Sequence, residues 1–208
     1  MTLAGKLAQG TAELGLSVPA EIQRKLLEYL ALIAKWNRIH NLTAVRESSL
    51  MVSSHLLDCL AVLPHLEAST VLDVGSGAGL PGIPLALMWP QARVTLLDSN
   101  HKKTTFLRQA TIELGLKNAE VVCVRVETWQ PPHPYDLVIS RAFSDLPEFL
   151  RLAGRKCAAH GTIATMKGVN PHEEIARLPH AFKLRRVVPI KVPGLRAERH
   201  LVLLSPAR

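Results

Sequence analysis

Residues 71–87 of the chain read VLDVGSGAGLPGIPLAL. A short apolar run of strand-forming residues leads into Gly75, Gly77 and Gly79, and a helix-like segment begins at Gly82. Glycines at such a turn let the backbone bend sharply and approach a ligand closely. The N-terminus of the helix that follows supplies free amide donors. We therefore predict a strand, a ligand-binding loop and a helix in this stretch.

Beyond this stretch, short strand-like runs alternate with helix-like segments, which is typical of βαβ units and a parallel sheet. The strand-like runs are VLDV, RVTLLD, EVVCV, YDLVIS and GTIATMK, and the helix-like segments cover 82–88, 102–114 and 145–159. At the end, LRRVVPIKV and RHLVLLS are joined only by PGLRAE, which is too short for a crossover helix, so these strands should pair antiparallel. A mostly parallel seven-stranded sheet that ends in an antiparallel hairpin is the methyltransferase form of the Rossmann-like α/β fold.

Two helices precede the sheet. Residues 19–39 carry apolar side chains at helical spacing, and a second helix is expected over residues 48–63. We predict one domain over residues 1–208, in which residues 1–68 form a helical cap and residues 69–208 form the catalytic core.

The composition limits the class of protein. With 208 residues, 48% of them hydrophobic and 20% charged, the chain can bury a full core and is not of a disordered class. Its first ten residues lack the apolar stretch of a signal peptide, and its other apolar runs are too short to span a bilayer. Cys59, Cys123 and Cys157 form no CxxC pair, so neither a disulfide framework nor a metal site is indicated. These features favour a soluble cytoplasmic protein without a bound metal.

The positive charge is concentrated in the last quarter of the chain. The net charge is +8, but residues 1–150 hold 13 lysines and arginines against 14 acidic residues, whereas residues 151–208 hold 12 against 3. Clustered cations attract a polyanion and release counterions on binding, although a basic surface can also serve solubility alone. The candidate phosphate contacts in this part are Lys167, Arg185, Arg186, Arg196 and Arg199.

Acidic residues near the glycine loop indicate which ligand it holds. The loop satisfies the GxGxxG dinucleotide pattern, but Asp73 lies just before it, where a carboxylate gains nothing from a pyrophosphate. S-adenosylmethionine has no phosphate and carries two cationic groups, which Asp73 would favour. Asp98 ends the next strand, 19 residues after Gly79, and is placed to accept hydrogen bonds from ribose hydroxyls, while Glu127 follows the third strand and can face an adenine. Because open α/β sheets bind ligands at the carboxyl ends of their strands, we predict an S-adenosylmethionine site there.

Three other functions remain open from the residues alone. The GxGxxG match suggests an NAD-dependent oxidoreductase, against which the terminal hairpin and Asp73 argue. An RNA-binding module without catalysis would not need the glycine loop, Asp98 and Arg141. A methyltransferase that acts on small molecules would not need the C-terminal charge.

Motifs that are missing from the sequence narrow the choice of the atom that is methylated. Amino-group methyltransferases that act on bases often carry an Asn-Pro-Pro-Tyr-like loop after the fourth strand, where this chain has SRAFSDL, and its PPHPY stretch at 131–135 precedes that strand. Carbon methylation of pyrimidines usually needs a cysteine nucleophile, and all three cysteines fall in predicted strands or helices. Guanine N7 needs no deprotonation, so alignment with the methyl group would suffice. Arg141, just after the fourth strand, is the candidate for positioning a phosphate, the base or the cofactor.

Several segments resemble the small-subunit ribosomal RNA methyltransferase G family, also called glucose-inhibited division protein B. The matching segments are KWNRIHNLTA at 35–44, HLLDCL at 55–60, VLDVGSGAGLPGIPLA at 71–86, LLDSNHKKTTFL at 96–107, VRVE at 124–127, ISRAF at 139–143 and MKG at 166–168. The resemblance implies methylation of a bacterial 16S ribosomal RNA at guanosine N7, with S-adenosylmethionine as the donor and the RNA or the small ribosomal subunit as the partner.

The resemblance also implies roles for individual residues. It places cofactor contacts at Gly75, Leu80, Val126, Glu127 and Arg141, with Gly77, Gly79 and Asp98 in the same pocket. Many members have alanine at the position of Val126, a change that a backbone contact tolerates. Trp36, Asn37 and Asn41 match a family motif; Trp36 is expected to pack, and the asparagines have no role that the sequence explains. His55 and Asp58, spaced i,i+3, are expected to pair on a helix surface or between helices rather than to act as a catalytic dyad.

Overall fold

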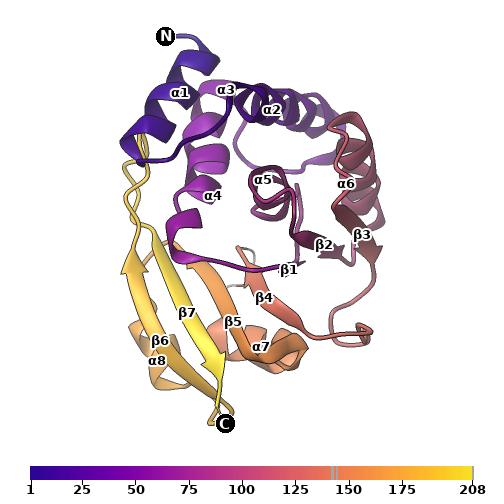
Figure 1. Cartoon of the computed structure of the whole chain (residues 1–208), viewed down its shortest axis with the longest axis vertical. Coiled ribbons are helices and arrows are strands. Elements are labelled where there is room, and N and C mark those ends of the chain that lie inside the picture. The colour runs from indigo at the N-terminus through magenta and orange to yellow at the C-terminus, as the bar shows by residue number, and fades with distance from the viewer. Residues whose placement is uncertain (142, 144, 208) are drawn as a thin grey trace.

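The computed structural model describes residues 1–141, 143 and 145–207. These residues form a seven-stranded sheet in the order β3-β2-β1-β4-β5-β7-β6 (Figure 1). β1 to β5 run parallel, whereas β7 is antiparallel to β5 and β6, so the predicted fold is confirmed. The strands are β1 (Thr70–Val74), β2 (Arg93–Asp98), β3 (Ala119–Cys123), β4 (Tyr135–Ser140), β5 (Cys157–Lys167), β6 (Phe182–Pro189) and β7 (His200–Pro206).

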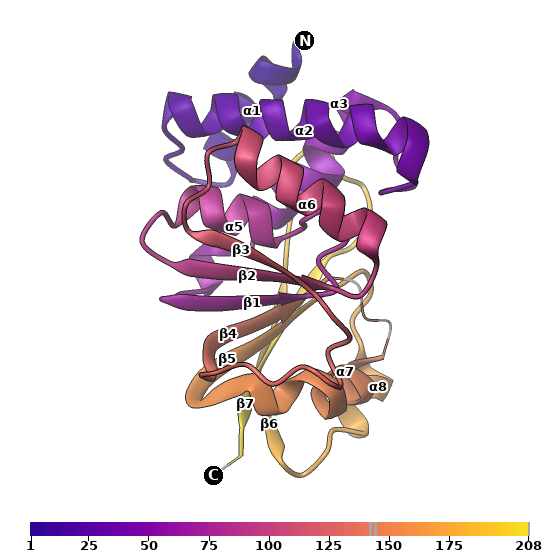
Figure 2. The same ribbon diagram turned by 90° about the vertical axis from the view of Figure 1, so that its right-hand side faces the viewer.

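Helices cover both faces of the sheet (Figure 2). α5 and α6 lie on one face, where α2 contacts both of them from outside, and α7 lies on the other face. The helices are α1 (Leu3–Glu13), α2 (Ala20–His40), α3 (Ser48–Met51), α4 (Asp58–Leu60), α5 (Gly82–Met88), α6 (His101–Glu113), α7 (Leu146–Ala153) and α8 (His172–Ala176), with a π-helical turn η1 (Val52–Leu57) and 3-10 turns η2 (Leu63–His65) and η3 (Gly154–Lys156).

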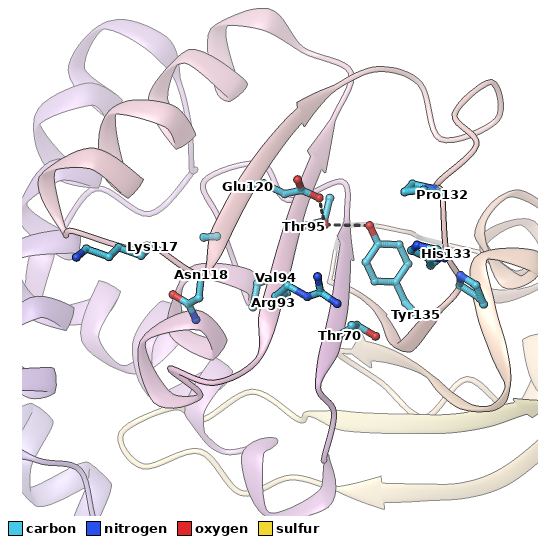
Figure 3. Close-up of a pocket in the computed structure, with 12 residues that line it drawn as sticks. Thr70, Arg93, Val94, Thr95, Lys117, Asn118, Glu120, Pro132, His133 and Tyr135 are labelled. Carbon is cyan, nitrogen blue, oxygen red and sulfur yellow. Dashed lines mark hydrogen bonds between the residues drawn. The ribbon is translucent and has the colours of Figure 1, made fainter.

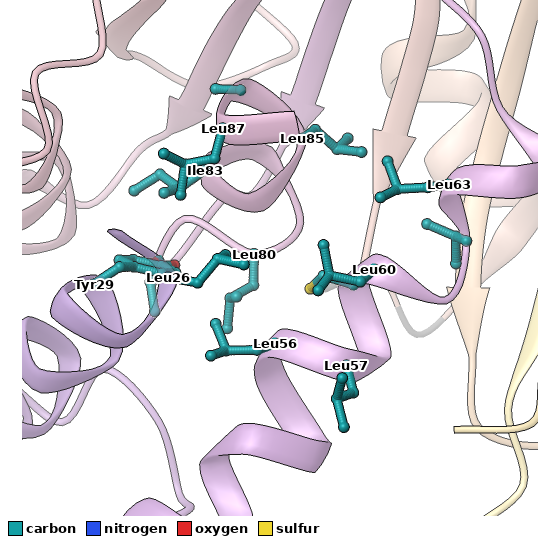
Figure 4. Packing of buried hydrophobic residues seen from close by; sticks show 14 of the residues in the cluster. Leu26, Tyr29, Leu56, Leu57, Leu60, Leu63, Leu80, Ile83, Leu85 and Leu87 are labelled. Carbon is teal, nitrogen blue, oxygen red and sulfur yellow. The ribbon is translucent and has the colours of Figure 1, made fainter. Parts of the chain in front are cut away.

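The core has two parts because side chains alternate between the faces of each strand. On one face, residues such as Val71 pack with the N-terminal helices, and on the other, residues such as Leu72 pack with Phe149 of α7. Figure 4 shows the first part, in which leucines of η1 and α4 and Tyr29 of α2 surround Leu80 and Ile83. Burying a leucine side chain fully stabilises the folded state by about 1.5–3 kcal/mol relative to leaving it exposed. The N-terminal helices are therefore held against the glycine loop by a shared apolar core.

Three elements differ from the sequence prediction. α1 lies outside the predicted elements because its two glycines lower helix propensity, yet Gly10 is where Leu57 packs: a Cβ on Gly10 would lie 2.3 Å from Leu57 Cδ1. The helix expected over 145–159 ends at Ala153, and β5 begins at Cys157, so Cys157 is in a strand rather than a helix. The helix expected over 48–63 forms, but its middle has π-helical geometry in η1.

Among the described residues, no helix is both long and apolar enough to cross a membrane. The same part of the chain contains no group of three or more His, Cys, Asp or Glu side chains arranged to hold a metal ion.

Candidate cofactor site and its arginine rim

The glycine loop leaves β1 with a left-handed backbone. Gly75, Gly77 and Gly79 have φ values of 69°, 59° and 89°, which glycine adopts without a steric penalty. A Cβ on Gly79 would lie 2.6 Å from Ile83 Cδ1, so this glycine is needed for packing. A Cβ on Gly77 would meet only the carbonyl of Gly75, at 3.8 Å, so its surroundings are open. The loop therefore combines a packed side at Gly79 with an open side at Gly77.

Asp73 holds this loop together from inside the protein. Its side chain is fully buried, and its Oδ2 accepts hydrogen bonds from Ser76 Oγ at 2.6 Å and from the amide of Gly82 at 3.0 Å. Burial raises the pKa of Asp73 to about 6, even though these hydrogen bonds and the positive charge of Arg141 oppose the shift. Its Oδ1 has no hydrogen-bond partner among the described residues. The sequence placed Asp73 near the ligand, and the structure adds a role in joining β1 to α5.

A pocket of about 400 Å³ opens at the carboxyl ends of β1, β2 and β3. Its lining includes four of the predicted cofactor contacts, which are Gly75, Asp98, Val126 and Glu127. Val74, Leu97 and Val124 give it apolar walls, and Ser99, Lys103, Arg125, Phe143, Glu148 and Leu152 complete the described lining. Carboxylates beside apolar walls suit a nucleoside, because the hydroxyls need acceptors and the base needs apolar contact.

Asp98 links the pocket to the glycine loop. Its Oδ2 accepts a hydrogen bond from the amide of Gly77 at 2.9 Å, and its Oδ1 accepts one from the amide of Asn100 at 2.8 Å. Each carboxylate oxygen has a second lone pair, so Asp98 can still accept hydrogen bonds from a ligand. By contrast, the side chain of Leu80 lies in the core with Tyr29 (Figure 4), which leaves only its backbone for a ligand.

Arg141 directly follows the carboxyl end of β4 and is not part of the lining that the described residues give this pocket. Its Nη1 donates to the carbonyl of Ser54 at 3.0 Å and to Asp58 Oδ2 at 3.3 Å. Asp58 Oδ1 accepts a second charged hydrogen bond, from Arg199 Nε at 3.1 Å. Burial alone would lower the pKa of Arg141, but neighbouring groups, Asp58 among them, raise it. One carboxylate thus connects two predicted site arginines.

The predicted pairing of His55 with Asp58 is wrong, because each side chain turns to a different partner. Both are buried, at 3% and 2% exposure. His55 Nε2 lies 2.9 Å from Thr43 Oγ1, whereas Asp58 binds the two arginines. Burial lowers the pKa of His55 to about 4, so its ring is neutral near pH 7. The i,i+3 spacing makes such a pair possible, but here the two side chains bind different partners.

The WNxxxNLT motif forms the turn that ends α2. Asn37 is buried, and its Oδ1 accepts a hydrogen bond from the amide of Thr43 at 2.9 Å. Asn41 takes a left-handed conformation with φ 46° just after the helix. Trp36 packs edge-on against Phe106 of α6, with ring centroids 5.6 Å apart, which confirms the expected packing role. The motif therefore shapes the turn that brings Thr43 to His55.

The five candidate RNA contacts have different surroundings. Lys167 is buried and its Nζ lies 2.7 Å from Glu174 Oε2, so this charge is already paired inside the protein. Arg199 is paired with Asp58 and keeps a quarter of its side chain exposed. Arg185 and Arg186 on β6, and Arg196 in the loop between β6 and β7, are exposed. The sequence could not separate the paired cations from the exposed ones.

A second pocket, of about 340 Å³, lies at the amino ends of the same strands (Figure 3). Tyr135 Oη donates to Thr95 Oγ1 at 2.9 Å, and Thr95 Oγ1 donates to Glu120 Oε1 at 2.6 Å. The PPHPY stretch contributes His133 and Tyr135 to this pocket. The stretch therefore lies at the end of the sheet opposite the glycine loop, as its position before β4 indicated.

Comparisons of the sequence with known proteins point to a single family, and a solved structure agrees with the fold. The family model described as rRNA small subunit methyltransferase G matches residues 22–202. The chain is 55% identical over 214 residues to a Nitrosospira multiformis protein named ribosomal RNA small subunit methyltransferase G, covering 100% of this chain and 99% of that protein. It is 56% identical to the protein of that name from Laribacter hongkongensis, covering 99% of each. Among solved structures, the O-methyltransferase TomG from Streptomyces achromogenes, in complex with SAM, aligns over 87% of this chain and 90% of its own with a TM-score of 0.61 and 20% identity, a likeness of fold.

Proposed function

The chain belongs to the rRNA small subunit methyltransferase G family, and from this premise we propose that it transfers a methyl group from S-adenosylmethionine to N7 of a guanosine in 16S ribosomal RNA. The observation that carries the proposal is identity above one half over essentially the full length of relatives with this name. The pocket beside the glycine loop supports it independently. The family and the terminal hairpin both argue against an NAD-dependent oxidoreductase.

The residues around the pocket fit the cofactor. When bound, S-adenosylmethionine supplies a methyl group on a sulfonium centre. Gly75 and the open side of Gly77 would let the cofactor approach the backbone. Asp98, Val126 and Glu127 line the same pocket; Asp98 would accept hydrogen bonds from the ribose hydroxyls, and Val126 and Glu127 would lie beside the adenine. Gly79, Leu80 and Asp73 act indirectly or through the backbone, because their surroundings are packed.

Chemistry at guanine N7 needs neither a cysteine nucleophile nor deprotonation of the target atom. Cys59 and Cys157 are buried, and burial raises the pKa of both thiols, that of Cys157 to about 12, so neither is a ready nucleophile. Cys123 is partly exposed, with its Sγ 3.4 Å from His101 Nδ1 at the start of α6. His55 is buried and bonded to Thr43. Catalysis is therefore proposed to rest on alignment of N7 with the methyl group rather than on proton transfer.

Arg141 acts by positioning. The product guanine carries a positive charge, so a guanidinium beside N7 would be unfavourable. Arg141 therefore directs the N–H groups that it does not use in hydrogen bonds with described residues at an anionic group, which is a phosphate or the carboxylate of the cofactor. Its pairing with Asp58 supports a fixed orientation.

The RNA-facing surface is proposed to include Arg185, Arg186, Arg196 and Arg199, with Lys167 contributing indirectly through its ion pair. The partner is 16S ribosomal RNA or the small ribosomal subunit, met in the cytoplasm. Each phosphate contact removed should lower the salt slope of RNA binding by about 0.7–0.9. An unaltered slope after neutralising all the exposed arginines would remove this surface from the proposal.

We also propose that residues 1–208 act as one domain, with residues 1–68 as a cap on a catalytic core of residues 69–208.

The deciding experiment is methyl transfer from labelled S-adenosylmethionine to 16S ribosomal RNA. Protein-free RNA and purified small subunits are assayed in parallel, and the digested product is identified as a nucleoside by mass spectrometry. The expected product is 7-methylguanosine. A methyl group on an exocyclic amine, a ring carbon or a ribose oxygen would overturn the assignment of N7.

A further inference from the structure

Asp58 is almost completely buried, yet it binds two arginines from distant parts of the chain. Its side chain is 3% exposed, and its two oxygens accept one charged hydrogen bond each, from Arg141 and from Arg199. Taking a carboxylate out of water costs several kcal/mol unless its oxygens are bound by charged partners. Replacing a buried ion cluster by apolar residues is often neutral or stabilising, so this arrangement points to a role beyond fold stability.

The three residues meet at the same end of the sheet as the pocket that contains Asp98 and Glu127, where the parallel strands have their carboxyl ends. Arg141 directly follows the end of β4. Arg199 directly precedes β7, whose first residue, His200, is paired with Lys167 at the end of β5. Asp58 comes from α4, in the N-terminal helices. Arg141 and Arg199 therefore lie at the same end of the sheet, where β4 and β5 end and antiparallel β7 begins. Asp58 of α4 connects the two arginines.

The cluster has charge and donors left for a ligand. Its one carboxylate and two guanidinium groups sum to a charge of +1. Arg141 uses only Nη1 in hydrogen bonds with described residues, and Arg199 uses Nε and Nη1, so N–H groups of both remain available. About a quarter of each arginine side chain is exposed, at 26% and 25%. Forked guanidinium donors with a net positive charge match the oxygens of a phosphate group.

The charge around the cluster favours the RNA as its ligand. The side chains of Arg141 and Arg199 are bonded to Asp58, which, like them, is outside the described lining of the pocket that contains Asp98 and Glu127. Arg199 also belongs to the C-terminal part of the chain, where 12 cationic residues face 3 acidic ones. We infer that Asp58 is a positioning residue that holds Arg141 and Arg199 together as a clamp for one backbone phosphate of the RNA. This inference rests on the proposed function.

The test substitutes Asp58→Asn and compares it with Asp136→Asn, a matched change at the opposite end of the sheet. The carboxylate of Asp136 accepts hydrogen bonds from Ser69 and Thr70, so it too has a structural role. Binding of 16S ribosomal RNA at several salt concentrations, cofactor binding by calorimetry, and thermal unfolding are measured for both. We expect Asp58→Asn to weaken RNA binding by about tenfold and to lower its salt slope, with cofactor affinity unchanged. Asp136→Asn should change neither affinity.

A double-mutant cycle separates positioning from general damage. If Asp58 acts through Arg199, adding Asp58→Asn to an Arg199→Gln chain should weaken RNA binding much less than adding it to the unmodified chain. Additive effects would overturn the inference, as would a loss of cofactor affinity in place of RNA affinity. Arg199→Lys keeps the charge and removes the fork, so it tests the clamp even if Asp58→Asn does not fold; unchanged RNA binding by this variant would also overturn it.

Failure of the inference is distinguishable from failure of the proposed function. Methyl transfer by the unmodified chain is measured alongside. If that chain does not methylate 16S ribosomal RNA, the proposed function fails. If it does, and a folded Asp58→Asn chain binds RNA equally well, only the clamp is wrong.

Discussion

A pocket of about 400 Å³ lies at the carboxyl ends of β1 to β3, and another of about 340 Å³ lies at the amino ends of the same strands. At the amino ends, polar groups bond to each other: Tyr135 to Thr95, and Thr95 to Glu120 (Figure 3). At the carboxyl ends, Asp98 is bonded yet retains free lone pairs, and Gly77 leaves open space. Two pockets of similar volume thus differ in how much bonding capacity remains for a ligand.

The same contrast appears in two aspartates on neighbouring strands. In β1, burial raises the pKa of Asp73 to about 6. In β4, burial would raise the pKa of Asp136, but hydrogen bonds from Thr70 and Ser69 outweigh it and hold that pKa below its usual value. The hydrogen bonds of Asp136 therefore stabilise its ionised form in the folded protein, whereas burial makes the ionised form of Asp73 unfavourable. Substitutions at the two ends should separate these roles.

The largest effect is expected from Gly77→Val. The β-branched side chain would project into the open space beside the pocket and abolish cofactor binding while the protein stays folded. Gly115→Val is the matched control, because Gly115 has φ 64°, nothing within 4 Å of an added Cβ, and a place between α6 and β3 at the other end of the sheet. Calorimetry and thermal unfolding of both variants check this. Near-normal cofactor affinity in Gly77→Val would remove the loop from the site.

Asp98→Ala should weaken cofactor binding by about 1.5–3 kcal/mol, the range for hydrogen bonds to a charged group. Part of this loss will come from the freed amide of Gly77, which Asp98 now orients. Asp136→Ala serves as the comparison: it removes a carboxylate of similar bonding but should alter only the unfolding temperature. Equal cofactor dissociation constants for Asp98→Ala and the unmodified chain would show that Asp98 is only a turn residue.

The raised pKa of Asp73 predicts a pH effect of about 3 kcal/mol on the free energy of unfolding. As the pH rises from about 4 to about 6, the unfolded chain ionises this residue while the folded chain keeps its proton, so the free energy of unfolding falls over that window. Asp73→Asn stays neutral and still offers an oxygen to Gly82, so its stability should exceed that of the unmodified chain at neutral pH. Denaturant unfolding across this range measures both. Parallel curves for the two proteins would contradict the shifted pKa.

The smallest effect is expected at the amino ends of the strands. Tyr135→Phe removes the hydrogen bond to Thr95 and should lower the free energy of unfolding by about 1 kcal/mol. Cofactor affinity and methyl transfer should not change. A clear loss of either would mean that the amino-end pocket takes part in function and that the contrast between the two ends is mistaken.

The sequence predicted those parts of the molecule that depend on local pattern. The strand, loop and helix over residues 71–88 follow from apolar spacing and glycines, and the terminal hairpin follows from a short connection. Gly75, Asp98, Val126 and Glu127 come together because each follows or ends a parallel strand, so their place in the sequence sets their place in the sheet.

Other features depend on packing between distant segments. The cluster of Asp58, Arg141 and Arg199 joins three elements, and helical spacing instead paired Asp58 with His55. Burial of Lys167 against Glu174 could not be predicted either, because a lysine at a strand end is usually exposed. α1 was not predicted because Gly5 and Gly10 lower helix propensity, although Gly10 is the residue that allows close contact with Leu57.

The position of β6 has a consequence for how copies of the chain behave toward each other. β6 is the last strand of the sheet, so its outer edge offers unpaired backbone groups on which a strand of another molecule could add. Lys183, Arg185 and Arg186 are exposed along it, and a second copy docking there would bring like charges together. The cations proposed to attract RNA therefore also oppose aggregation through this edge. Neutralising them should make the purified protein more prone to self-association, an effect to be separated from any change in RNA binding.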